Sequence, residues 1–349
     1  MVVPATGRVH ERSSTAVASV TLGDPPEFGV EMRTAGAARV HGASVPSQAR
    51  LLRLPLKLAD FERRGFRLDH PDERVLLETH ARNFLTGFNL AAKHWRDPHP
   101  ALSCIEPTER GFAYEGAAMY AALRDAVPPG GSDAMRRLCE GTGDDYIHLI
   151  HVGYGWAGAV PRMPVPDTIP ATPLLRWLAL DGAGFAAVYF GGLRALRRRW
   201  DREPTQRWQA RAAGFGRALW FVESASVDGV TRVINEAPPQ ARPHLWSGIA
   251  LACCYAGGAD LAQLDRLVHS CGTYWPHFGQ GALFAIAARA RAGHVPAHTA
   301  AACRHLFAVS PDNAREWTDI AATGLTGSPG ISAYSEWKSR LRDMVTAPP

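Results

Sequence analysis

Several sequence signatures of common enzyme classes are missing from this chain of 349 residues. It contains no P-loop, no GxSxG elbow and no cysteine-rich metal motif. Its six cysteines form no CxxC pair and lack the spacing of a secreted disulfide framework, which favours reduced thiols in a cytoplasmic protein. We therefore expect no organic cofactor and a cytoplasmic location.

Long apolar runs and strong charge are missing as well. Polar residues or prolines interrupt each apolar run before it reaches membrane-spanning length, and the amino terminus lacks the layout of a signal peptide. The formal charge of +5 is modest, and the basic run Arg194 to Arg199 fits a solvated helix face better than a nucleic-acid surface. No membrane span and no nucleic-acid partner are expected.

Apolar residues are plentiful and follow a helical period. They make up 46% of the chain, enough for a globular protein with one large core or two smaller ones. Residues 1–46 are rich in small residues and read as a weakly ordered leader. Apolar residues three and four apart predict helices over 73–94, 111–126, 144–156, 174–200 and 205–226. The sequence therefore predicts an all-α protein.

Two pairs of segments resemble each other along the chain. "RWLALDG" (176–182) aligns with "RLVHSCG" (266–272), and "GFAYEG" (111–116) aligns with "LWFVES" (219–224). The shared order predicts a single domain, 47–349, built of two related halves at about 80–200 and 205–310. Such halves would form an α/α array or a toroid around an apolar cavity. Chance similarity between helices is the alternative.

Glu115 interrupts an otherwise apolar helix face. It lies on the same side as Phe112 and Met119, so its carboxyl group should face the interior, as should that of Glu223 beside Leu219. A buried carboxyl group either finds a partner or keeps its proton. Glu115 and Glu223 are thus candidate acid-base residues. In the alternative interpretation they brace helices by pairing with arginines such as Arg110 and Arg217 or with backbone amides.

Three further residues carry polar chemistry near "DDYIHLIH". Asp144, His148 and His151 are spaced to share one helix face, so they could bind a divalent metal, although no ligand from another element is evident. Proton transfer by His148 or His151, or an ordinary structural role, are the alternatives. An Asp-Gly turn is predicted at Asp181, whose carboxylate would cap a helix starting near Gly184 or take part in catalysis.

Aromatic residues gather around the same segments. Most are expected in the core, but with inward carboxylates they could also line an elongated apolar pocket for a polyene. Their ring faces could stabilise positive charge on a carbon skeleton. The candidate substrate-binding residues are Trp156, Phe185, Tyr189, Trp220, Trp246, Tyr274 and Trp275.

Five segments together resemble a known family. They are "ERGFAYEGAAM", "DDYIHLIHVGYGWA", "LDGAGFAAVYF", "GRALWFVESAS" and "LWSGIALACCYAGG", within about residues 83–293. They resemble the bacterial family called domain of unknown function 1702, whose members are often described as enediyne biosynthesis proteins. The resemblance implies a gene beside iterative polyketide synthases in a natural-product cluster. At Ala186 and Ala187 the sequence departs from the family pattern, which has a histidine soon after "DGxGF".

Together these features predict an enzyme of bacterial natural-product biosynthesis. It would remodel or cyclise a hydrophobic polyene intermediate by acid-base chemistry, with Glu115, Glu223, Asp181, His148 and His151 as candidate catalytic residues. One alternative is an unconventional terpenoid cyclase. Another is a non-catalytic protein that shelters a pathway intermediate or partners a neighbouring enzyme of the cluster.

Overall fold

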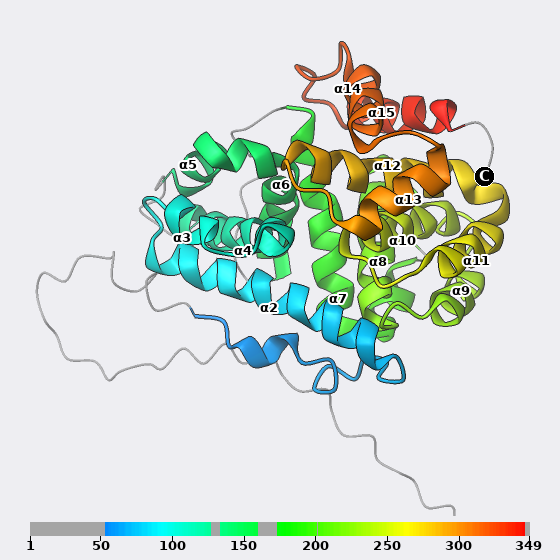
Figure 1. Ribbon diagram of the computed structural model, residues 1–349, viewed down its shortest axis with the longest axis horizontal. Helices are drawn as coiled ribbons and strands as arrows, with labels where there is room; N and C mark the ends of the chain where they lie inside the picture. The colour runs from blue at the N-terminus through cyan, green and yellow to red at the C-terminus, as the bar shows by residue number, and fades with distance from the viewer. Residues whose placement is uncertain (1–52, 127–132, 160–172, 201, 346–349) are drawn as a thin grey trace, which may run out of the picture. The chain divides into compact units, whose positions relative to one another are not determined.

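The computed structural model describes residues 53–126, 133–159, 173–200 and 202–345, and no β-strand occurs among them (Figure 1). The all-α prediction is confirmed. The predicted leader, 1–46, lies outside the described residues.

In chain order the α-helices are α2 (Pro71–Lys93), α3 (His99–Ser103), α4 (Pro107–Ala126), α5 (Ala134–Cys139), α6 (Ile147–Trp156), α7 (Leu178–Trp200), α8 (Gln206–Val222), α9 (Val227–Glu236), α10 (Arg242–Ala256), α11 (Leu261–Cys271), α12 (Trp275–Arg291), α13 (Ala297–Phe307), α14 (Pro311–Ala322) and α15 (Ile331–Met344). Short 3-10 helices are η1 (Leu56–Ala59), η2 (Gly141–Tyr146), η3 (Ala157–Ala159), η4 (Leu175–Trp177) and η5 (Gly272–Tyr274).

Several helices begin at residues whose side chains accept a hydrogen bond from the first turn. Thr205 caps α8, Ser226 caps α9 and Ser310 caps α14. Asp260 forms a reciprocal capping box with Gln263 at the start of α11. These short polar side chains satisfy amides that have no intrahelical partner, so they fix the helix boundaries locally.

The long helices pack in chain order, each against the next: α2, α4, α6, α7, α8, α10 and α12. Glycines lie at the crossing points. A Cβ atom at Gly182 of α7 would collide with the carbonyl oxygen of Val152 in α6, and one at Gly214 of α8 with that of Asp181. The same relation joins Gly153 to Glu115, Gly248 to Ala213 and Gly281 to Ser247. Only glycine permits this backbone approach, so the crossings fix the register of successive helices.

This register places two carboxyl groups at equivalent positions. Glu115 directly precedes Gly116 in α4, and Asp181 directly precedes Gly182 in α7. In α8 the equivalent residue is Ala213, whereas Glu223 follows the helix as its C-terminal cap. The glycine register thus relates single helices to one another. The division into halves at 80–200 and 205–310, and closure as a toroid, remain predictions.

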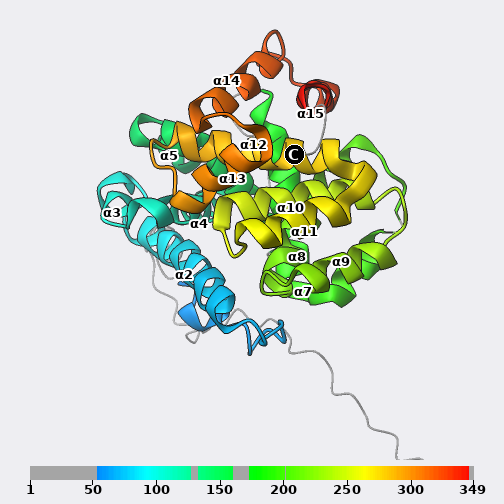
Figure 2. The same cartoon turned by 45° about the vertical axis from the view of Figure 1, so that its right-hand side comes forward.

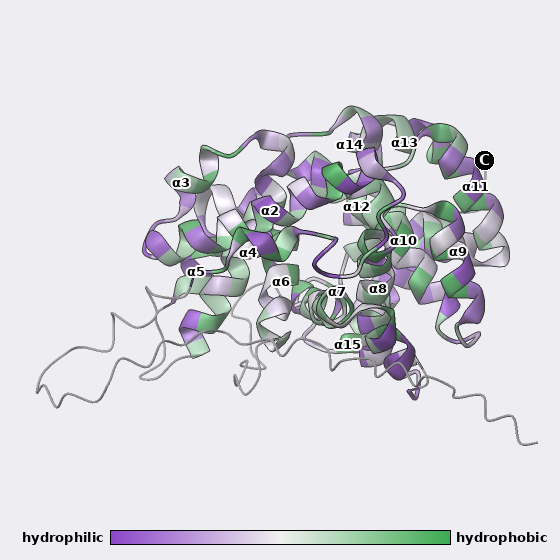
Figure 3. Cartoon of the chain, turned by 90° about the horizontal axis from the view of Figure 1, so that it is seen from below, coloured by the Kyte–Doolittle hydropathy of each residue, from purple (hydrophilic) through white to green (hydrophobic). Residues whose placement is uncertain are grey.

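The remaining helices pack around this series. α14 and α15 lie beyond α12, and α9 and α11 lie together (Figures 1 and 2). α9 is strongly amphipathic, and Figure 3 shows hydrophilic and hydrophobic residues alternating along it. His80 of α2 joins the first helix of the series to α10, since its Nε2 lies 2.9 Å from the carbonyl oxygen of Ala256. Six helices, α2, α4, α6, α7, α8 and α10, therefore contribute to one cavity.

Candidate functional site

Arg217 of α8 lies between two buried carboxyl groups. Its Nε is 2.6 Å from Oδ1 of Asp181 in α7, and one of its terminal nitrogens is 3.6 Å from Oε1 of Glu115 in α4. All three side chains are at most 8% exposed. The closer contact to the guanidinium therefore belongs to Asp181.

Trp156, the last residue of α6, completes the environment of Glu115. Its indole Nε1 donates a hydrogen bond of 2.9 Å to Glu115 Oε1. Arg110, one of the partners predicted for Glu115, instead donates to the carbonyl oxygens of Ser103 and Ile105. The predicted inward direction of Glu115 is confirmed, and Arg217 is its cationic partner.

The charge balance of this cluster is unequal. Two carboxyl groups face one guanidinium, and all three are shielded from water. Burial raises the pKa of Glu115 against the opposing effects of Arg217 and Trp156, and burial also raises the pKa of Asp181 against that of Arg217. Burial would lower the pKa of Arg217, but the two acids outweigh it and raise this pKa. Because two buried acids face a single cation, the cluster favours retention of one proton between the two acids.

The predicted Asp-Gly turn at Asp181 is wrong. Asp181 lies in the first turn of α7, which begins at Leu178, and its side chain pairs with Arg217 instead of capping a helix near Gly184. Gly182 is used for close packing against α6. Tertiary packing therefore overrides the turn preference of the dipeptide.

A first cavity, of about 50 Å³, lies on one side of the Glu115 and Arg217 pair. Its walls are mainly aromatic and aliphatic, with few polar groups. The lining residues are Leu54, Leu58, Arg64, His80, Ala81, Phe84, Leu85, Phe112, Glu115, Trp156, Phe185, Tyr189, Phe190, Arg217, Phe221, Leu251, Ala252, Tyr255 and Ala256. A cavity of this composition suits an apolar ligand that carries one polar group.

Guanidinium groups cover several of the aromatic faces in the first cavity. Arg64 lies 4.5 Å from the ring centroid of Tyr189 and 4.9 Å from that of Phe190. Arg217 lies 4.8 Å from that of Phe185. These cation-π contacts occupy ring faces that a positively charged intermediate would need. Sequence reasoning missed Arg64 as a lining residue because η1 and the turn after it are far from the other lining residues in sequence.

The seven aromatic residues predicted to bind substrate lie in different surroundings, and their role in binding stays a prediction. Trp156, Phe185 and Tyr189 line the first cavity. Trp220 donates instead to the carbonyl oxygen of Gly257, and neither it nor Trp246, Tyr274 or Trp275 lines either cavity described here. Trp246 and Trp275 both pack near Phe278 in the core between α10 and α12. Helical periodicity identifies buried aromatics but cannot say which cavity they face.

A second cavity, of about 80 Å³, lies on the other side of Arg217. Arg217, Leu251 and Tyr255 line both cavities and so separate them. The second cavity is enclosed by α6, α7, α8, α10, α12, α14 and α15. Its polar lining residues are His148, Asp181, Arg217, Ser247, Tyr255, Gln280, Arg291, Arg315, Thr318, Asp319, Tyr334 and Lys338.

The predicted metal ligands do not come together. Asp144 lies in η2, outside α6, and its carboxylate pairs at 2.7 Å with Arg291. His148 and His151 are both buried in α6, where burial lowers the pKa of His148 to about 3 and that of His151 to about 4. Among the described residues, no three histidine, cysteine, aspartate or glutamate side chains gather as a metal site.

The two histidines have different surroundings. Nδ1 of His151 lies 2.7 Å from the carbonyl oxygen of Ile147, while His148 faces the second cavity. Nδ1 of His148 has no hydrogen-bond partner among the described residues. Both imidazoles are neutral at pH 7, given these lowered pKa values. Their predicted role in proton transfer stays a prediction.

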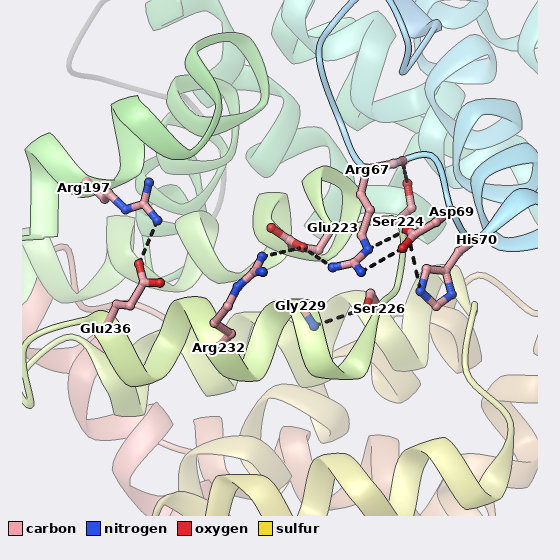
Figure 4. A network of polar contacts seen from close by, with 10 residues as sticks. All are labelled: Arg67, Asp69, His70, Arg197, Glu223, Ser224, Ser226, Gly229, Arg232 and Glu236. Carbon is pink, nitrogen blue, oxygen red and sulfur yellow. Dashed lines mark hydrogen bonds and ion pairs between the residues drawn. The ribbon is translucent and has the colours of Figure 1, made fainter.

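Glu223 belongs to a different network, drawn in Figure 4. It follows α8, and its carboxylate pairs with Arg67 at 3.2 Å and with Arg232 at 3.6 Å. The backbone amide of Arg67 donates to the carbonyl oxygen of Val222, and the hydroxyl of Ser224 donates to that of Arg67. Glu223 thus fastens the segment before α2 to the end of α8 and does not line either cavity.

These observations define an all-α protein with a buried carboxyl, guanidinium and indole cluster between two cavities. Residues 46–345 match the family described as "Protein of unknown function (DUF1702)", and the chain belongs to this family. No curated protein and no solved structure matches the chain significantly. Within the described part of the chain, no helix combines the length and apolar content needed to cross a bilayer.

Proposed function

We propose that this protein binds a hydrophobic polyene intermediate of a bacterial natural-product pathway in the first cavity, and that Glu115 acts on it as an acid-base group. One observation carries the proposal. Of the two acids in its cluster, Glu115 is the one that lines the first cavity, whose walls are mainly apolar and aromatic side chains. The raised pKa, caused by burial, favours the protonated acid that such chemistry requires.

The simplest reaction that this arrangement supports is an isomerisation. The protonated carboxyl group of Glu115 donates its proton to one carbon of a double bond, and the neighbouring carbon becomes cationic. The carboxylate then removes a proton from a different carbon, so a double bond reforms at a new position. No oxidant, reductant or organic cofactor enters this balance. Arg217 would stabilise the transient carboxylate.

A polyene requires the first cavity to open. Its volume of about 50 Å³ is smaller than the roughly 150 Å³ of an engineered cavity that holds benzene. Leu54, Leu58 and Arg64 precede α2 and form part of the wall, and Arg67 fastens the same segment to α8. Displacement of this segment would enlarge the cavity without separating the long helices.

Two alternatives receive different support. A terpenoid cyclase needs ring faces for a carbocation, but Arg64 and Arg217 already lie over three of the rings that line the first cavity, which weighs against it. A non-catalytic protein that shelters an intermediate, alone or with a neighbouring enzyme of its pathway, needs only the cavity. The contacts of Glu115 with Trp156 and Arg217 favour this non-catalytic alternative, because they give the carboxyl group a structural role.

Glu115→Gln separates catalysis from binding. The amide keeps the shape and the acceptor for Trp156 but cannot transfer the proton. With all-trans-retinol as the polyene probe, we expect the unmodified protein to produce a new isomer that chromatography resolves. The rate of isomerisation by the variant should be at least ~100-fold lower, while a fluorescence titration should show that it still binds retinol. Glu236→Gln, which alters a surface pair with Arg197, is the matched control and should keep full activity.

The outcomes distinguish the classes. An active Glu115→Gln variant would remove Glu115 from the mechanism. Retinol that is bound and returned unchanged by the unmodified protein would favour the sheltering function. Absence of binding would contradict both. Conversion of farnesyl diphosphate, but not of retinol, would favour the terpenoid cyclase.

A further inference from the structure

Lys338 is a buried amine in the wall of the second cavity. It lies on α15, and only 6% of its surface is exposed. Its Nζ lies 5.6 Å from the centroid of the Tyr334 ring. An ammonium group in this position would be expensive to desolvate without a partner.

The identity of this residue is unusual for the chain. Only three of the 38 lysine and arginine residues are lysines, namely Lys57, Lys93 and Lys338. Lys57 and Lys93 are exposed, whereas Lys338 faces a cavity. Arginine supplies the other buried cations, and it cannot be deprotonated in proteins. A lysine at this position therefore offers a property that arginine lacks, a neutral amine that can act as a nucleophile.

The groups around the amine support this property. Burial lowers the pKa of Lys338 to about 8, helped by the charge of Arg342 and opposed by that of Asp181. The charged and titratable groups that line its cavity or interact with it are His148 of α6, Asp181 of α7, Arg217 of α8, His244 and Tyr255 of α10, His277 and Arg291 of α12, Arg315 and Asp319 of α14, and Tyr334 and Arg342 of α15. Cationic groups outnumber anionic ones, which favours the neutral form of the amine.

We propose that the second cavity binds a small aldehyde or ketone and that Nζ of Lys338 forms an imine with its carbonyl carbon. The nitrogen lone pair attacks the carbonyl carbon, and the oxygen takes both protons of the amine and leaves as water. Hydrolysis reverses the reaction, so no other reactant is needed. Tyr334 and Asp181, which line the same cavity, are positioned to pass protons to and from the oxygen. This site does not depend on the function proposed for the first cavity.

Reductive trapping tests the site directly. The full-length protein is incubated at pH 7 with butanal and sodium cyanoborohydride, which converts an imine to a stable secondary amine. Peptide mapping by mass spectrometry then gives a separate rate for each lysine. With a pKa of about 8, against an ordinary lysine value of roughly 10.4, Lys338 should be modified at least ~10-fold faster than Lys57 and Lys93.

Lys338→Met provides the matched variant, because methionine fills a similar volume without the amine. It should abolish the fast adduct and leave the rates at Lys57 and Lys93 unchanged. The comparison within the unmodified protein stands even if this variant does not fold. The proposal would be overturned if Lys338 were modified no faster than the two surface lysines. It would also be overturned if Lys338 were modified fast only in urea, when the protein is unfolded. Neither result depends on retinol binding or on Glu115.

Discussion

Nε of Arg217 lies 2.6 Å from Oδ1 of Asp181, at a depth where both side chains are at most 8% exposed. This contact joins α7 to α8 and fixes the guanidinium beside Glu115. Removing one member of a buried ion pair leaves the other charged and without water, which is costly. The pair therefore ties the stability of the fold to the geometry of the candidate site.

Arg217→Met should destabilise the protein strongly. Two buried carboxyl groups would lose their cation, at a cost of about 3–5 kcal/mol in the free energy of unfolding. Urea denaturation followed by circular dichroism measures this. Arg197→Met is the control, because the Arg197 and Glu236 pair is about half exposed and should contribute at most about 1 kcal/mol. Equal losses in the two variants would refute a special role for the buried cluster.

Glu115→Gln should change the pH dependence of stability. Burial raises the pKa of Glu115 above 4.5, so the folded protein holds this proton more tightly than the unfolded chain does. The contribution of this proton to the free energy of unfolding is lost as the pH rises from about 4.5 through the pKa that Glu115 has in the folded protein. Relative to the unmodified protein, the variant should gain stability over this window, by about 1.4 kcal/mol for each unit of pKa difference. The measurement is urea denaturation of both proteins between pH 4 and pH 8. If their free energies of unfolding differ by the same amount at every pH, the prediction is wrong.

Gly214→Ala tests the close helix crossings. The added methyl group would collide with the carbonyl oxygen of Asp181, so α7 and α8 must separate and the Arg217 pair must stretch. We expect a loss of more than about 1 kcal/mol in thermal or urea unfolding. Gly158→Ala, at an exposed position with open space around the glycine, should change stability by less than about 1 kcal/mol. A neutral Gly214→Ala would show that the crossing tolerates a side chain.

Glu223→Gln should loosen the segment before α2 without altering chemistry. The carboxylate pairs with Arg67, whose backbone amide donates to Val222. Hydrogen exchange at the amides of residues 61–67 should accelerate, and retinol should associate faster because this segment forms part of the wall of the first cavity. Glu236→Gln should leave both rates unchanged. Loss of isomerisation in Glu223→Gln, with retinol binding intact, would instead restore Glu223 as a catalytic residue.

Local patterns predicted much of the secondary structure. The predicted helix over 73–94 corresponds to α2, Pro71–Lys93, and that over 111–126 to the main part of α4. At 144–156 the boundary differs, because η2 occupies the first residues and α6 begins only at Ile147. Asp181 shows a second kind of failure, because an Asp-Gly pair is read locally as a turn while packing holds it inside a helix.

The sequence by itself determined which stretches form helices and that Glu115 faces inward, because both follow from a period of 3.6 residues within one segment. Only the tertiary structure decided that Arg217 and Trp156 face Glu115, that Glu223 anchors a distant segment, and that Lys338 faces a cavity. These relations join residues far apart in the chain, across helix crossings set by glycines. No local period encodes such distances, since they depend on how closely successive backbones approach.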